Sequence, residues 1–132
     1  MPLILYVLFA MTLMPIVLAW LGAYYRFKQF GRFDNHHPRI QQAQLTGTGA
    51  RIQGAQLNAW ESLIVFVAVL IIAVASGLDL NRLDTVAIVY LLCRLSHGGF
   101  YIANLAWLRS GVYALGMGCC LYLVYLSVQH SA

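Results

Sequence analysis

The sequence predicts an all-α integral membrane protein, folded as an up-down bundle of four helices. Hydrophobic residues make up 61% of its 132 residues and charged residues only 9%, whereas soluble globular domains have an apolar share nearer ~45–50%. The apolar residues gather in four stretches, and we treat residues 1–132 as a single domain built from them. These stretches are Leu3–Tyr25, Leu63–Ser76, Leu83–Leu105 and Trp107–Val128.

The first stretch, Leu3–Tyr25, is long enough to cross a bilayer, which takes ~20 apolar residues. No basic residue precedes it, and it is longer than the apolar core of a signal peptide. We therefore expect a helix that is kept in the mature protein. Pro15 lies in its middle and is expected to kink it, because proline removes one backbone hydrogen bond.

The second stretch, Leu63–Ser76, is short on apolarity alone. Extended back to Ala55, it gives a sufficient helix whose first turns are polar. The third and fourth stretches each reach the spanning length. The connections on either side of the third are short, and short connections place antiparallel helices side by side.

One long polar segment, from Arg26 to about Ala50, separates the first two helices. Its Gly/Thr cluster at 46–49 is typical of a turn before the second helix. His36 and His37 are adjacent and have no third ligand at useful spacing, so a surface loop is expected here and no metal site.

The same segment fixes the expected orientation, because basic residues concentrate in cytoplasmic loops. It holds five bases against one acid, Asp34; the bases are Arg26, Lys28, Arg32, Arg39 and Arg51. We therefore expect this loop in the cytoplasm and both termini outside. Most of the formal net charge of +4 sits in this loop, and no basic stripe with interleaved aromatics predicts a nucleic-acid partner.

Two charged residues, Glu61 and Arg94, lie inside the apolar stretches. An ionised side chain is costly in hydrocarbon, so it normally faces a protein interior or a wet cavity and has a partner. Two interpretations follow: a buried Glu61–Arg94 ion pair within one subunit, or membership of a functional site. The three cysteines also lie in the spans, where a thiol behaves as a small hydrophobic group.

The up-down topology brings polar residues of three helices to one half of the membrane. Within each helix the spacing of seven, four or three residues puts them on one face. They comprise Arg51, Asn58 and Glu61, then Arg94, His97 and Tyr101, then Arg109, Ser110 and Tyr113. Several arginines with neutral hydrogen-bonding groups and one carboxylate suit an anionic ligand that carries several carboxyl groups.

This pattern resembles the MAPEG family (membrane-associated proteins in eicosanoid and glutathione metabolism). The matching motifs are Arg51-x6-Asn58-x2-Glu61, Arg94-x2-His97-x3-Tyr101 and Arg109-Ser110-x2-Tyr113. Within the family the chain resembles the microsomal glutathione transferases and prostaglandin E synthase, and we expect a bacterial-type member. The resemblance implies a homotrimer in membrane lipid, with glutathione as thiol cosubstrate bound between subunits near the cytoplasmic face.

The resemblance also implies residue roles. Arg109 would stabilise the glutathione thiolate, and Ser110 would lie beside it in the catalytic set, although alone it equally fits a hydrogen-bonding residue at a helix start. The expected glutathione-binding residues are Arg26, Arg51, Asn58, Glu61, Arg94, His97, Tyr101 and Tyr113.

One residue departs from the family pattern. Glutathione-using members commonly carry an arginine four residues before the asparagine of the second helix, where this chain has Gly54. Two functions therefore stay open. The first is a glutathione-dependent transferase or peroxidase acting on lipophilic electrophiles; the second is a non-catalytic protein of the same fold that binds a lipid or another small molecule. A transporter is disfavoured, because the polar stripe lines only one half of the membrane.

Overall fold

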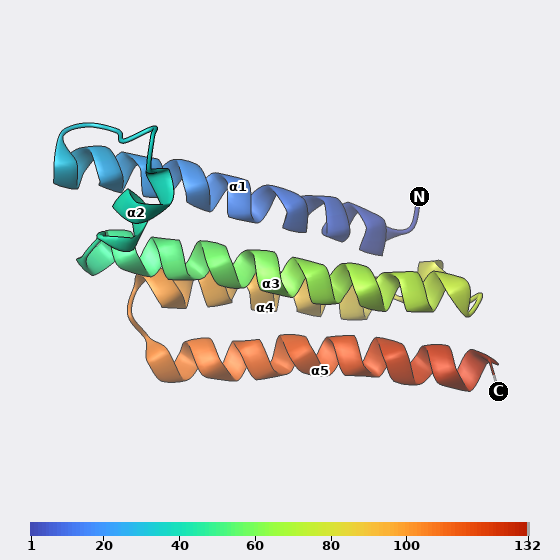
Figure 1. Cartoon of the computed structure of the whole chain (residues 1–132). Helices are drawn as coiled ribbons and strands as arrows, with labels where there is room; N and C mark the ends of the chain where they lie inside the picture. The colour runs from blue at the N-terminus through green and yellow to red at the C-terminus, as the bar shows by residue number, and fades with distance from the viewer. Residues whose placement is uncertain (132) are drawn as a thin grey trace.

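The computed structural model describes residues 1–131, which are almost entirely helical (Figure 1). Four long helices are joined by one long and two short connections, which contain one short α-helix and one 3₁₀ turn. The helices are α1 (Leu3–Phe30), α2 (Pro38–Ala43), α3 (Gly47–Ala75), α4 (Asp84–Ile102) and α5 (Ala106–Ser131), with the 3₁₀ turn η1 at Leu80–Arg82. The predicted all-α class is confirmed for the described residues.

The long helices α1, α3, α4 and α5 are each long and apolar enough to cross a membrane. The four predicted spans are therefore confirmed by length and composition. Two of them reach well beyond the predicted bounds, since α1 continues to Phe30 and α3 begins at Gly47. At 1.5 Å per residue, α3 is about 44 Å long, so part of it extends past a hydrocarbon core of about 30 Å.

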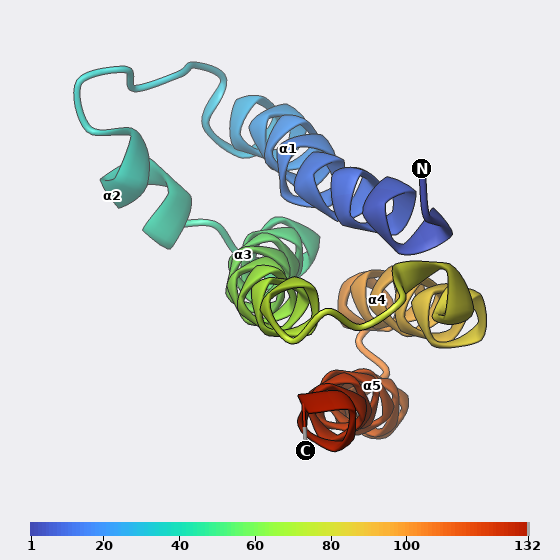
Figure 2. The ribbon, with the colours of Figure 1, turned by 90° about the vertical axis from the view of Figure 1, so that its right-hand side faces the viewer.

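The four long helices run up and down beside one another, as predicted. Seen end-on, α3 and α4 occupy the middle of the bundle, with α1 and α5 on opposite sides of it (Figure 2). Helix α1 packs on α3 and α4, and α5 packs on α4 and α3. The start of α1 and the end of α5 lie at one end of the bundle, and the α1–α3 and α4–α5 connections lie at the other (Figure 1).

The apolar core is concentrated in the half of the bundle nearer the termini. Phe66 of α3 and Tyr90 of α4 stack there with ring centroids 4.1 Å apart, and the Tyr90 hydroxyl donates to the Ser62 carbonyl at 3.1 Å. A second, smaller cluster near the other end contains Leu18, Ala55 and Ala59. Large apolar side chains thus give way to alanine and polar groups towards the end with the long connection.

The segment predicted as a polar surface loop is more ordered than expected. Gly31 follows the last residue of α1 in the left-handed conformation (φ 70°), and its N–H donates to the Phe27 carbonyl. Pro38 opens α2 at the first helical position, which needs no N–H. The prediction of a turn at 46–49 is wrong for most of its length, because α3 already begins at Gly47.

Candidate functional site

The predicted polar residues of α3, α4 and α5 gather at the end of the bundle that carries the long connection. Arg51 lies in the first turns of α3, Tyr101 in the last turn of α4, and Arg109 in the first turn of α5. Because α4 runs opposite to α3 and α5, these three turns meet at the same end (Figure 1). Hydrogen bonds and aromatic contacts involve most of the predicted residues there.

Arg94 of α4 and Asn58 of α3 form the central polar contact between these helices. Arg94 is only 2% exposed, and its Nη2 donates to Asn58 Oδ1 at 2.7 Å. The same nitrogen lies 3.5 Å from the Asn58 carbonyl oxygen. With Oδ1 accepting from a cation, the amide of Asn58 is oriented and its two N–H donors remain for another partner.

The predicted ion pair between Glu61 and Arg94 is wrong within one chain. Across residues 1–131, the ion pairs join His37 to Asp34 and Arg82 to Asp79. Glu61 is exposed on the surface of the subunit, whereas Arg94 is buried.

Arg109 contacts one ring of a group of three, which comprises Tyr101, His97 and Tyr113. Its guanidinium carbon lies 4.4 Å from the centroid of the Tyr101 ring, within the range of a cation–π contact. The His97 ring lies 5.7 Å from Tyr101 and 6.0 Å from Tyr113. His97 is 3% exposed, and its Nδ1 is buried without a hydrogen-bond partner in residues 1–131. The up-down topology predicted that these four residues would lie near one another, and they do.

Arg51 joins α3 to the end of α4. Its Nε donates to the Ile102 carbonyl at 2.9 Å, and its Nη2 donates to the Thr48 hydroxyl at 2.9 Å. Arg51 is half-buried, and its third nitrogen, Nη1, has no hydrogen-bond partner in the described part of the chain. The sequence interpretation missed Thr48, although its place one turn before Arg51 was a usable signal.

Arg26 lies apart from these residues and holds the α1–α3 connection. Its Nε and Nη2 donate to Gln41 Oε1 at 3.0 and 2.6 Å. Gln41 is 6% exposed; it also donates to the Arg32 carbonyl and accepts from the Asp34 backbone N–H. Gln41 was not predicted. Pro38 followed by a short polar run could have indicated the helix on which it lies.

Ser110 makes a contact within its own helix. Its hydroxyl donates to the Ala106 carbonyl at 3.0 Å, and the residue is exposed beside Arg109. This geometry fits a hydrogen-bonding residue at a helix start. No histidine or carboxylate contacts the hydroxyl in residues 1–131.

The charge at this end of the bundle is one-sided. Arg51, Arg94 and Arg109 have no carboxylate within 4 Å in the described residues. Their contacts are instead to amide, hydroxyl and carbonyl oxygens and to an aromatic ring. Neutral partners leave the positive charge uncompensated, so the arrangement attracts an anion with groups that guanidinium can bind.

Asp34, in the connection, has a different role. Its Oδ1 accepts the backbone N–H groups of His37 at 2.8 Å and His36 at 2.9 Å. The hydrogen bond from His37 lowers the pKa of the Asp34 carboxyl, and that from His36 adds to the effect. Asp34 is therefore ionised at neutral pH and fixes the turn before α2.

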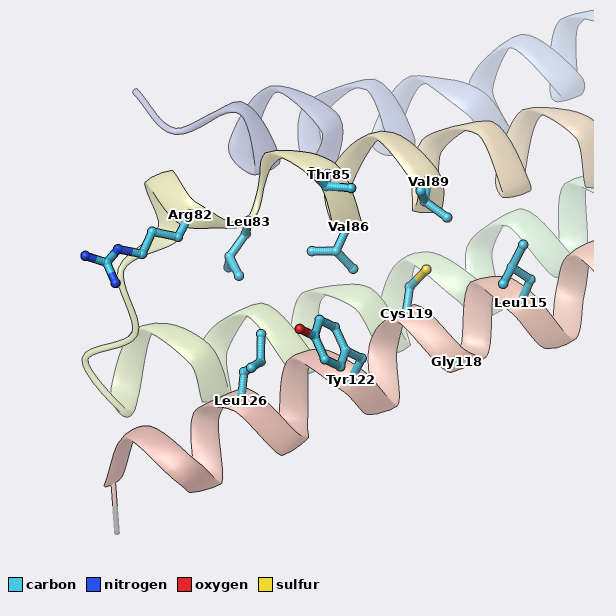
Figure 3. A pocket seen from close by; sticks show the side chains of 10 residues that line it. All are labelled: Arg82, Leu83, Thr85, Val86, Val89, Leu115, Gly118, Cys119, Tyr122 and Leu126. Atoms are coloured by element: carbon cyan, nitrogen blue, oxygen red, sulfur yellow. The ribbon is translucent and has the colours of Figure 1, made fainter.

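A cavity of about 470 Å³ lies between α4 and α5 at the opposite end of the bundle (Figure 3). Its walls are Arg82, Leu83, Thr85, Val86, Val89, Leu115, Gly118, Cys119, Tyr122 and Leu126. The Arg82 side chain points away from it, towards Asp79, with Nε 3.5 Å from Oδ2 (Figure 3). A ligand site usually offers several converging polar groups, and this cavity does not.

The MAPEG family model matches residues 3–129. The match covers the four long helices except the last two residues of α5, and it includes every residue at the polar end of the bundle. Among the curated proteins and the solved structures, none matches the chain.

Proposed function

The chain belongs to the MAPEG family, and we propose that it is a glutathione-dependent transferase or peroxidase acting on lipophilic electrophiles. Four apolar helices and the family together make it an integral, multi-pass membrane protein. Membership also supports a role in glutathione-related chemistry of the membrane. The specific activity rests on the residues at the polar end of the bundle.

The observation that carries the proposal is the set of arginines without carboxylate partners. Glutathione offers two carboxylates and one thiol, and a planar guanidinium binds a carboxylate through two parallel hydrogen bonds. The half-buried Arg51 has a nitrogen available for this contact, and Asn58 has both amide donors available. Glutathione also carries one ammonium group, for which the exposed Glu61 is the matching carboxylate. The residues therefore fit the ligand.

Arg109 is placed to favour the reactive form of a thiol. It lies in the first turn of α5, where the backbone N–H groups before it have no intrahelical partner and give a positive end. A cation and a helix N-terminus both lower the pKa of a nearby thiol, and the thiolate is the nucleophile. In transfer, the sulfur forms a bond to the electrophilic carbon, the leaving group departs with its electron pair, and the thiol proton passes to water.

Glu61 supports a site shared between subunits. It lies at the midpoint of α3, fourteen residues from both Gly47 and Ala75, and it is exposed in the single chain. A carboxylate facing lipid inside the hydrocarbon core would be costly, so we infer that a second subunit or a ligand covers it. We propose a homotrimer in which a neighbouring subunit covers this face of α3; the number three is taken from the family.

The test separates binding from chemistry. We expect Arg109→Ala to lower turnover far more than glutathione affinity, because thiolate stabilisation is the main loss. Arg51→Ala should weaken binding, with a smaller effect on turnover at saturation. Arg82→Ala, an exposed arginine at the other end of the bundle, is the matched control and should change neither. Calorimetry gives the affinity, and conjugation of a halogenated aromatic gives the turnover.

The ultraviolet absorbance of bound thiolate gives a direct reading of the mechanism. We expect this signal with glutathione in the wild type and its loss in folded Arg109→Ala. Persistence of the signal in that variant would show that another group stabilises the thiolate.

One residue favours a second candidate, a non-catalytic protein that binds a lipid or another small molecule. Gly54 stands where glutathione-using relatives commonly carry an arginine. If the purified wild-type protein binds no glutathione, this second function replaces the first.

We also propose that the polar end faces the cytoplasm and the termini face away from it, because residues 26–51 carry five of the eight lysines and arginines. Reporter fusions at Ile40 and after the C-terminus test this orientation. A cytoplasmic C-terminus would contradict it.

A further inference from the structure

Gly54 of α3 faces the side chain of Tyr101, which comes from the last turn of α4. A Cβ atom at position 54 would lie 2.5 Å from the Tyr101 hydroxyl oxygen, 2.7 Å from Cζ and 2.8 Å from Cε1. Contacts this short are not found around real Cβ atoms. A side chain at residue 54 would therefore force the hydroxyl end of the Tyr101 ring to shift.

The same ring supports Arg109. The guanidinium carbon lies 4.4 Å from the ring centroid, and the His97 ring meets the ring at an interplanar angle of 67°. The Tyr101 hydroxyl has no hydrogen-bond partner among residues 1–131, so contact with the α3 backbone at Gly54 and ring contacts with His97 and Arg109 hold the side chain. A shift of the ring away from α3 would carry it away from this arrangement.

We propose that Gly54 is a positioning residue: it seats Tyr101 against α3, and Tyr101 in turn holds the Arg109 guanidinium. The lack of a side chain at position 54 thus contributes to the geometry of the site. An arginine introduced there would place its Cβ where the outer end of the Tyr101 side chain now lies. The catalytic consequence rests on the proposed function, whereas the positioning itself can be measured without glutathione.

The measurement that needs no ligand is the labelling rate of Arg109 by phenylglyoxal, mapped by peptide mass spectrometry. Arg82, at the opposite end of the bundle, serves as the internal reference. We expect Gly54→Ala and Tyr101→Leu each to increase the relative labelling of Arg109 severalfold, because the first shifts the ring away from α3 and the second removes it. Tyr101→Phe keeps the ring and should stay within about twofold of the wild type. Gly118→Ala, whose Cβ would meet nothing within 4 Å, is the matched helical-glycine control.

The catalytic readout uses the same variants. Loss of a partly buried cation–π contact lowers a rate that depends on it by on the order of tenfold. We expect that loss in the kcat of Gly54→Ala, with a smaller change in the Kd of glutathione. Because the glycine acts through the tyrosine, adding Gly54→Ala to Tyr101→Leu should have little further effect.

Two results would overturn the proposal. One is wild-type labelling of Arg109 in folded Gly54→Ala; the other is additivity of Gly54→Ala and Tyr101→Leu. If Gly54→Ala fails to fold, equal labelling in Tyr101→Leu and Tyr101→Phe overturns it, and faster labelling in Tyr101→Leu alone supports it. If the wild type shows no glutathione-dependent activity, the proposed function falls, while the labelling still decides the positioning.

Discussion

The contact between Arg94 and Asn58 predicts an asymmetry in stability. Arg94 is 2% exposed and donates to Asn58 Oδ1 at 2.7 Å. Asn58→Leu removes that acceptor and leaves a buried cation with only the weak 3.5 Å contact to the backbone carbonyl of residue 58. Because a hydrogen bond to a charged group contributes about 1.5–3 kcal/mol, we expect a loss of that size in the free energy of unfolding.

The converse substitution should be much milder. Arg94→Met removes the charge together with its need for a partner, and a long apolar side chain fills similar space. The Asn58 amide then loses one bond but remains half-buried, where other partners are accessible. We expect Arg94→Met to stay within about 1 kcal/mol of the wild type. The double variant should recover most of the loss seen in Asn58→Leu alone.

The assay is thermal unfolding in detergent without glutathione, followed by glutathione binding. Arg94→Met should melt close to the wild type yet bind glutathione more weakly, because the Asn58 amide is no longer oriented. Arg82→Met is the control, since an exposed substitution changes stability by no more than about 0.5 kcal/mol. The reasoning is refuted if Arg94→Met melts several degrees lower while Asn58→Leu is unaffected. That outcome would mean that a carboxylate of another subunit pairs with Arg94.

Three further predictions concern the connection and the assembly. Gln41→Ala removes the acceptor shared by Arg26 Nε and Nη2. We therefore expect the free energy of unfolding to fall by about 1.5–3 kcal/mol and proteolysis between α1 and α3 to become faster. Unchanged cleavage would contradict this prediction. The pKa of Asp34 is lowered in the folded protein; its stabilisation of the turn should therefore be complete above the ordinary carboxyl value near 4 and be lost as the pH falls through the lowered pKa. Amide-exchange protection factors at His36 and His37, which correct for the intrinsic pH dependence of exchange, measure this. We expect them to fall at acidic pH in the wild type and to be low at all pH values in Asp34→Ala, whereas pH-independent protection would exclude the prediction. Native mass spectrometry should show a trimer, which Glu61→Lys weakens; a stable wild-type monomer removes the shared site.

The four spans and the convergence of the polar residues could be predicted from the sequence because both follow from long-range regularities. Apolar length identifies a span, and antiparallel order brings the ends of α3 and α4 and the start of α5 together. The start of α3 could not be predicted in the same way. Residues 47–54 lack an apolar run, and their helix is held by packing, as where Gly49 approaches Tyr25 and Leu45.

The error over Glu61 has a geometric cause. Residues three apart on a helix are about 60° from each other around its axis. That separation lets Asn58 face α4 and bond Arg94, while Glu61 turns to the outside of the subunit. The sequence interpretation assumed that two isolated charges must satisfy each other. The amide oxygen of Asn58 accepts from the buried cation instead. Which residue of α3 faces Arg94 depends on the rotation of α3 about its axis, and the spacing of residues along the sequence does not determine that rotation.

Gly54 links the departure from the family pattern to the contact between Tyr101 and Arg109. In the sequence, Gly54 stands where glutathione-using members are expected to carry an arginine. In the bundle, the space beside it holds the Tyr101 ring, with atoms closer than 3.0 Å to where a Cβ would stand. The proximity of α3 and α4 at this level creates that relation, and no spacing within either helix encodes it. The residue that lacks a cationic side chain at position 54 is therefore also the residue that leaves room for the ring in contact with Arg109. The glycine alone does not argue against a functional site, because the contact that it permits holds the guanidinium on which the proposed chemistry depends.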